Sequence, residues 1–235
     1  MDASKFLRLP LSANEHSYVD LGLPSGTKWA TMNVGASSET DYGNYYMYGK
    51  GNSTYNTLDA AYTGTENPLA SSADAATQVW GDYWHIPTKA QFEELFANTT
   101  YEWTTINSVN GGKFTANNGN YVFFPAAGSY LHDSINGVGN YGEYLSSTPY
   151  DDTTIYYMQC YDSDKFMPTY YREAGFSVRG VMNSNPASKV AITGSYNDLS
   201  DKPTIPQIWS GTQAQYTALG PDYNSNTIYI ITSAS

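Results

Sequence analysis

The residue types best suited to binding chemistry gather between positions 141 and 171. This segment holds eight of the chain's 23 Tyr, interleaved with Asp, Ser and Thr. Tyr offers a large amphipathic contact at low entropic cost, and Asp and Ser add adaptable hydrogen bonds, so this mixture is typical of ligand-binding loops. Tyr is also a good strand former, and a Tyr-rich but ordinary sheet face is the alternative interpretation.

The strand expected over 155–161 divides its side chains between two faces. Alternation places Tyr156, Met158 and Cys160 on one face and the residues between and after them on the other. Because Met and Cys suit a core, we expect the second face to be exposed. The predicted ligand-binding residues are this exposed set together with residues of the flanking loops: Tyr141, Tyr144, Tyr150, Asp151, Asp152, Tyr157, Gln159, Tyr161, Asp162, Asp164, Phe166, Tyr170 and Tyr171.

Nucleophilic catalysis would need a nucleophile beside a base and an orienting partner. Cys160 is the one Cys and falls on the expected core face, and none of the three His stands in a motif with it or with a Ser. A single Cys also excludes an internal disulfide and a multi-thiolate zinc site. We therefore predict a binding protein that is not an enzyme and needs no cofactor or metal.

Two acidic pairs offer the remaining site chemistry. Asp151-Asp152 and Asp162-Ser163-Asp164 could ligate calcium or form a glycosidase pair. Neither pair has the closely alternating oxygen donors and the Gly of a calcium loop, which favours solvated loop acids or ligand contacts. No Gly-rich segment follows an expected strand and opens a helix, so the phosphate-cradling motifs are absent from the sequence.

Composition narrows the class of protein. The 235 residues are 40% apolar and only 14% charged, so the bulk of the chain should fold around a core. The formal net charge of −11 disfavours nucleic acid and anionic membrane surfaces as partners. No apolar run approaches the length of a membrane span, and the first residues lack the features of a signal peptide.

The elements that must position the binding residues are few helices and many short strands. The clearest helix is expected at about 88–97, with Thr88 as N-cap, Gln91 completing a capping box, and Phe92, Leu95 and Phe96 on the buried face. A weaker helix is expected over 71–77. Strands are expected at 121–125, as a central strand, and at 155–161 and 175–181, separated by Gly/Asn turns. This pattern predicts the α+β class with mostly antiparallel strands.

A composition shift near residue 183 divides the chain. After a lead-in of residues 1–17, residues 18–182 are rich in Trp, Tyr and Gly and form the expected ligand-binding domain. Prolines punctuate a polar stretch at 183–206, which is linker chemistry. Residues 207–235 then form a small module with a short helix at 213–219 and a strand at 227–232. A module this short cannot bury much surface alone, so we expect it to need a partner chain or the main domain.

Five stretches, in order, resemble the Fibrobacter-type major paralogous domain of gut Bacteroidetes and their phages. They are residues 18–36, 84–95, 124–128, 145–150 and 175–181, and the second reads Trp84-His85-Ile86-Pro87-Thr88-Lys89-Ala90-Gln91-Phe92-Glu93-Glu94-Leu95. The resemblance covers about residues 18–182 and implies a C-type-lectin-like fold. That fold is akin to the formylglycine-generating enzyme and to the variable proteins of diversity-generating retroelements. In such proteins mutagenesis of template adenines diversifies codons near the end of the domain, and the composition of 141–171 is similar to that outcome.

Two departures limit what the resemblance implies. The Glu-Pro-Asn and Gln-Pro-Asp triplets of calcium-dependent lectins are absent, and so is the cysteine pair that would support an oxidase-like activity. The resemblance therefore implies neither calcium-dependent sugar binding nor catalysis.

The tail resembles parts of phage tail fibres. Residues 191–206 are similar to a segment that recurs in fibres, and residues 208–230 to a small module at fibre ends. The resemblances together imply a virion receptor-binding protein that adheres to a bacterial surface molecule, glycan or protein. They also imply contact with other tail proteins and a homotrimer formed through the tail. The alternatives are a bacterial cell-surface adhesin, which a lipoprotein or secretion signal would mark, and a formylglycine-generating-type enzyme, which a reactive Cys160 would mark.

Overall fold

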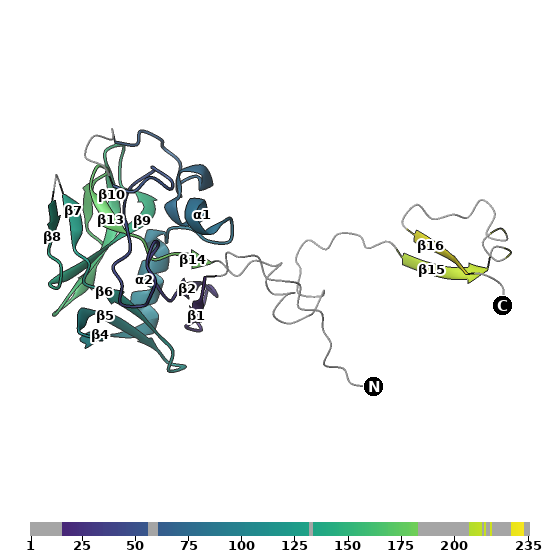
Figure 1. Ribbon diagram of the computed structural model, residues 1–235, viewed down its shortest axis with the longest axis horizontal. Coiled ribbons are helices and arrows are strands. Elements are labelled where there is room, and N and C mark those ends of the chain that lie inside the picture. The colour runs from purple at the N-terminus through teal and green to yellow at the C-terminus, as the bar shows by residue number, and fades with distance from the viewer. Residues whose placement is uncertain are drawn as a thin grey trace. The chain divides into compact units, whose positions relative to one another are not determined.

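The computed structural model describes residues 16–55, 61–131 and 134–182, and in the tail 207–212, 214, 217 and 227–232. The chain divides into two compact units, Met1–Ser184 and Asn185–Ser235, which Figure 1 draws with their labelled elements. The expected linker at 183–206, most of the lead-in and most of the helix expected at 213–219 lie outside the described residues. The two units are therefore taken one at a time.

The larger unit is built on an eight-stranded sheet. Six strands follow the order β11-β10-β9-β13-β7-β8, while β12 pairs with β10 and β3 with β13. The neighbouring strands β9 and β10 are the longest of this sheet. The bounds are Tyr45–Met47 for β3, Ser129–Leu131 for β7, Ser134–Asn136 for β8, Tyr141–Pro149 for β9, Thr154–Tyr161 for β10, Lys165–Phe166 for β11, Thr169–Tyr171 for β12 and Gly175–Ser177 for β13.

Two smaller sheets complete this unit. One has the order β1-β2-β14, with bounds Tyr18–Asp20, Lys28–Ala30 and Val181–Met182. The other is the antiparallel meander β4-β5-β6, with bounds Thr99–Ile106, Val109–Ala116 and Tyr121–Pro125. The strand expected at 121–125 therefore forms, but at an edge of its sheet and not at the centre. Its four consecutive residues 122–125 are nevertheless buried, so both of its faces are covered there.

The described helices are short. They are the 3₁₀ turn η1 at Ser71–Ala73, α1 at Ala75–Trp80 and α2 at Lys89–Asn98. The helix α2 confirms the prediction at 88–97: Thr88 is its N-cap, the capping box with Gln91 is present, and Phe92 and Leu95 are fully buried. It packs between the meander and β9–β10, which Figure 1 shows. Among the described residues no helix is long and apolar enough to cross a membrane.

The expected α+β, C-type-lectin-like class is wrong. In the described residues two α-helices, of 6 and 10 residues, stand beside strands arranged in four sheets, so the chain is β-rich. The weaker helix expected at 71–77 forms instead as the turn η1 at 71–73 and the helix α1 at 75–80. Asp74 accepts a hydrogen bond from the Thr77 backbone N–H and caps α1 there, and Gly81 ends the helix with a positive φ of 95°. Only six residues remain for that helix.

Both faces of the eight-stranded sheet are covered, which gives the unit two hydrophobic cores. The first core contains Ala30, Val34, Tyr46, Tyr48, Leu69, Ala73, Ala75, Ala76, Trp80, Trp84, Ile86, Leu145, Ile155, Tyr157, Ala174, Phe176 and Val178. The second core contains Leu21, Leu23, Trp29, Phe92, Leu95, Phe114, Ala116, Val122, Phe124, Tyr144, Met158, Cys160 and Val181. The strand β10 contributes side chains to both, since alternate residues of a strand point to opposite faces.

The smaller unit contains a two-stranded sheet. Its strands β15, at Gln207–Thr212, and β16, at Thr227–Thr232, pair in parallel over six residues each. The strand predicted at 227–232 is thus present. A two-stranded ribbon leaves one edge of each strand without a ladder partner inside the ribbon.

Candidate functional site

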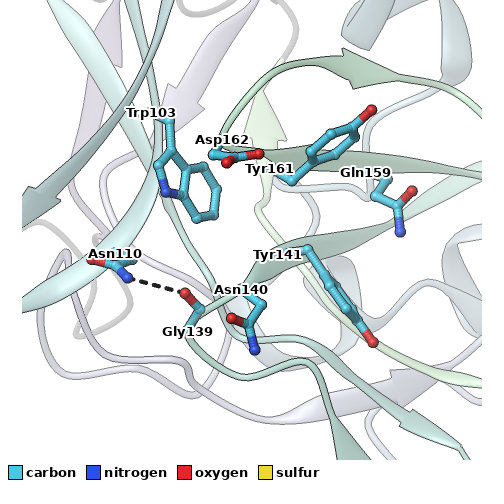
Figure 2. Close-up of a pocket in the computed structure, with 8 residues that line it drawn as sticks. All are labelled: Trp103, Asn110, Gly139, Asn140, Tyr141, Gln159, Tyr161 and Asp162. Carbon is cyan, nitrogen blue, oxygen red and sulfur yellow. Dashed lines mark hydrogen bonds between the residues drawn. The ribbon is translucent and has the colours of Figure 1, made fainter.

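One end of the β9–β10 pair faces the end of the β4–β5 hairpin across a hollow of about 460 Å³. This volume falls in the range of small-ligand sites, about 300–1,000 Å³. Figure 2 shows the side chains around it. The lining comes from three stretches far apart in sequence: Trp103 and Asn110, then Gly139, Asn140 and Tyr141, and then Gln159, Tyr161 and Asp162.

The β4–β5 hairpin supplies an aromatic wall. Trp103 lies on β4 opposite Gly112 of β5, and its half-buried side chain packs against the second core. In Figure 2 the Trp103 indole points from its strand toward the middle of the hollow, with Asp162 beside it. Because the core holds one part of the ring, the part that reaches the hollow is fixed in position.

The Asn110 side chain lines the hollow and is held by hydrogen bonds at both ends of its amide. The Asn110 Nδ2 donates to the Gly139 carbonyl oxygen at 3.0 Å, and the Thr105 hydroxyl lies 2.7 Å from Asn110 Oδ1. The first bond ties β5 to the turn that precedes β9, and the second holds the amide against β4. Asn110 therefore serves the shape of the hollow, since both ends of its amide are engaged within the protein.

The turn before β9 admits the ring of Tyr141. Gly137 has φ of 78°, and a Cβ there would fall 1.9 Å from the Tyr141 ring. Only glycine tolerates both the left-handed backbone and this close approach. The turn thus lets Tyr141 lie at the rim of the hollow.

Near the hollow, side chains of β9 and β10 lie opposite one another on the same face of the sheet. Tyr141 opposes Tyr161, and Glu143 opposes Gln159. The Gln159 Nε2 donates to Glu143 Oε1. Burial raises the pKa of the Glu143 carboxyl, and hydrogen bonds including those from Gln159 and Tyr157 oppose that rise. The hollow is thus backed by a buried acid that fixes the amide of Gln159.

The charge of the lining is acidic or neutral. None of the eight lining residues is Lys, Arg or His, and Asp162 is exposed. Within the part of the chain that the structure describes, no three His, Cys, Asp or Glu gather as metal ligands. The lining also lacks a nucleophile paired with a base, so its arrangement suits non-covalent contact.

The structure distributes the predicted binding residues over two places. Tyr141, Gln159, Tyr161 and Asp162 line the hollow, and Asp164 and Phe166 follow in the adjoining turn and β11. At the other end of β10 lie Tyr150, Asp151, Asp152, Tyr170 and Tyr171. This second group, here called the hairpin-tip group, is separated from the first by most of an eight-residue strand, roughly 20 Å at about 3.3 Å per residue. The single binding face expected from the sequence is therefore split.

Two of the predicted binding residues are buried and were wrongly placed. Tyr144 is 0% exposed because it opposes Met158 and points with it into the second core, where its hydroxyl donates to the Pro125 carbonyl at 2.7 Å. Tyr157 is 7% exposed and stacks on Phe176, with ring centroids 4.9 Å apart. It faces away from Met158 as expected, but the first core covers that part of the face.

Asp151 is exposed, but its carboxylate is engaged in the hairpin turn. Its Oδ1 accepts hydrogen bonds from the backbone N–H groups of Thr153 and Thr154 at 2.8 and 2.7 Å. The hydrogen bond from Thr153, followed by those from Thr154, lowers the pKa of Asp151 to about 2. The residue therefore shapes the turn, while its neighbour Asp152 has an exposed side chain.

Sequence reasoning missed Trp103, Asn110 and Asn140. Turns are expected from the sequence at 110–112 and 136–139, but 110–112 lies inside β5, where Gly111 and Gly112 pair with β4. Nothing local showed that this strand meets the turn before β9. Trp103 stands in a strand whose pattern gave no sign of which neighbour it faces.

The thiol of Cys160 provides a test of the enzyme alternative. It is 0% exposed, and burial raises its pKa to about 12. A Cβ at Gly112 or Gly142 would fall 3.1 Å from its Sγ, so the surrounding backbone encloses it. We expect no measurable reaction with a maleimide at pH 7 in the native protein and complete reaction in urea, because only the thiolate reacts. Rapid labelling of the folded chain would support the alternative of a formylglycine-generating-type enzyme.

Comparison with known protein families gives a match in the tail of the chain. Residues 206–232 match the phage tail tip domain, a range that contains both strands of the smaller unit. No curated protein and no solved structure matches the chain. The match relates the chain to phage tail proteins and points to a component of the virion. The resemblance to retroelement variable proteins stays a prediction.

Proposed function

We propose that the chain is a receptor-binding protein of a phage tail, and that the hollow between β4–β5 and β9–β10 contacts a molecule of the bacterial surface. The observation that carries the proposal is the hollow itself, which is lined by aromatic, amide and carboxylate side chains from three distant segments. Pockets with aromatic walls and a few placed polar groups are the usual form of binding sites. The tail tip match supplies the setting.

The same arrangement supports adhesion without catalysis. The lining offers one exposed carboxylate and no nucleophile beside a base, and the lone Cys is enclosed in the second core. The bacterial surface adhesin is the less favoured alternative, because the match at residues 206–232 is to a phage family.

Matched triple variants test which surface binds. The first changes Asn140, Tyr161 and Asp162 at the hollow to Ala. The second changes Tyr150, Asp152 and Tyr171 of the hairpin-tip group to Ala, and serves as a control of similar size and chemistry. Since central aromatic contacts dominate such interfaces, at about 2 kcal/mol or more each, we expect the first variant to lose at least tenfold in binding of fluorescent protein to host cells.

The outcome separates the two places. Melting temperatures of both variants should stay near that of the parent chain, because the changed side chains are exposed or partly exposed. Loss of binding in the hairpin-tip variant alone would move the site to the other end of β10. Full binding by both variants would refute adhesion through either group.

The oligomeric state follows from the tail in this proposal. The described pair β15–β16 is a two-stranded ribbon, which is marginal alone and gains stability by pairing with further copies. We expect the full chain to be a trimer and residues 1–184 to be a folded monomer, both measured by light scattering. A monomeric full chain would contradict this expectation.

A further inference from the structure

The hollow also carries information about the chemistry of its ligand. Its aromatic wall is the Trp103 indole, which the second core holds in place. The face of an aromatic ring is electron-rich and attracts weakly positive C–H groups that lie flat against it. Such a wall suits a ligand with a flat, C–H-bearing ring.

Two polar side chains of the lining, Gln159 and Asp162, present acceptors. The Gln159 Nε2 is committed to Glu143, which leaves the Gln159 Oε1 as an acceptor. The Asp162 carboxylate only accepts when ionised. Asn110 is engaged at both ends of its amide. A ligand that lies on the Trp103 ring can therefore donate a hydrogen bond to the neighbouring Asp162 carboxylate (Figure 2).

The charge around the hollow argues against an ionic ligand. With no Lys, Arg or His in the lining, and with Glu143 buried behind Gln159, an anion would meet two acids and no compensating cation. A cation would find one carboxylate at Asp162, but that group is exposed, so water screens its charge and a pair there adds little. An uncharged ligand fits these constraints best.

From these three features we infer that the hollow binds a neutral pyranose ring of a surface glycan, whose C–H face lies on Trp103 and which donates a hydroxyl hydrogen bond to Asp162 beside that ring. The inference rests on the proposed function, because it names the ligand of the same site. It requires no metal ion, since the acceptors come from the protein. Specificity then arises from where the hydroxyl donors stand on the ring.

Ligand-observed saturation-transfer NMR on the full chain tests this assignment. The neutral probes are methyl glycosides of glucose, galactose, mannose, rhamnose, N-acetylglucosamine and N-acetylgalactosamine, with chelator present. Glucuronic acid and glucosamine are the charged comparators. We expect at least one neutral glycoside to bind, and each charged comparator to bind at least fivefold more weakly.

Variants place the bound sugar. Trp103→Leu removes the flat ring and should weaken binding at least tenfold, whereas Trp103→Phe keeps a ring and should weaken it less. Asp162→Ala, at an exposed position, should weaken binding at least threefold whether or not the Trp103 variants fold. Tyr150→Ala, in the hairpin-tip group, should bind as the parent chain does.

Each other result overturns the inference. A charged comparator that binds best would assign an ionic ligand. A sugar whose binding is unchanged by the Trp103 and Asp162 variants would bind elsewhere on the protein. If no probe binds while the triple variant at the hollow still abolishes binding to host cells, the receptor is not a neutral glycan and the proposed function stands. If host-cell binding is also unaffected, the proposed function fails as well.

Discussion

Replacing Phe124 with Ala is expected to lower the free energy of unfolding of the larger unit by about 3–5 kcal/mol. The ring is fully buried on β6 and is surrounded by other aromatic side chains. Its centroid lies 4.8 Å from that of Tyr144, 5.3 Å from that of Phe114 and 5.7 Å from that of Trp29. Truncation leaves a cavity lined by rigid rings, which cannot collapse to fill it.

A second loss adds to the cavity. The guanidinium carbon of Arg179 lies 5.3 Å from the Phe124 ring centroid, and Arg179 is itself fully buried. A desolvated cation over an aromatic face is stabilised by about 2 kcal/mol or more. Without the ring, that buried charge keeps its hydrogen bonds to the carbonyl oxygens of Ala30 and Phe123 but loses its aromatic contact.

Urea unfolding followed by circular dichroism measures the effect. Phe166→Ala is the control, because Phe166 is 38% exposed on the short strand β11. We expect the control to change the free energy of unfolding by less than about 0.5 kcal/mol. Similar losses in the two variants would show that Phe124 does not lie at the centre of the second core.

The helix α2 could be predicted from the sequence because its signals are local. Thr88 and Gln91 are three residues apart, and the capping box depends only on that spacing. Phe92 and Leu95 fall on one side of any helix through them. None of this needs knowledge of the rest of the chain, and the structure confirms each part.

The exposure of β10 could not be predicted in the same way. Alternation correctly separates Tyr157 from Met158 and Cys160, but it says nothing about what covers each face. Phe176 lies on β13, nineteen positions further along the chain than Tyr157, and its ring covers the Tyr157 ring. The inference that one face is core and the other is free assumes a sheet covered on one side, and this sheet is covered on both.

The same limit applies to the fold class and to the site. Several strands of two or three residues, such as β11 and β14, are defined by pairing with other strands. They are too short to show the alternation of apolar and polar residues by which a strand is predicted. Half of the lining comes from Trp103, Asn110 and the turn at 139–140, and Trp103 and Asn110 meet residues 139–141 and 159–162 only through tertiary packing. Composition identified the Tyr- and Asp-rich half of the lining, because an enrichment of these residue types is itself typical of binding surfaces.

Gly128→Ala is expected to lower the free energy of unfolding by more than about 2 kcal/mol, because it combines two costs. Gly128 has φ of 65°, a conformation that costs an L-residue about 1–2 kcal/mol. A Cβ there would also fall 2.0 Å from the Asn136 carbonyl oxygen and 2.9 Å from the Val138 nitrogen. Both are backbone atoms, so no side chain can rotate away to relieve the collision.

Gly119→Ala isolates the collision from the backbone strain. Gly119 has φ of 85° and no heavy atom within 4 Å of a Cβ built on it, so its change should cost only the backbone strain of about 1–2 kcal/mol. Urea unfolding therefore compares a variant that carries only backbone strain, Gly119→Ala, with one that carries both strain and collision, Gly128→Ala. Equal losses would mean that the 136–138 segment yields freely to the added methyl group.

The collision at Gly128 should also reach the hollow. The Gly128 N–H donates to the Tyr141 carbonyl oxygen at 2.9 Å, and the Gly139 N–H donates to the Ala126 carbonyl oxygen at 2.8 Å. Displacing the 136–138 segment moves the turn that carries Gly139 and Tyr141, so folded Gly128→Ala protein should bind host cells at least threefold more weakly than Gly119→Ala protein. Equal binding by the two folded variants would show that the position of this turn does not matter to the receptor.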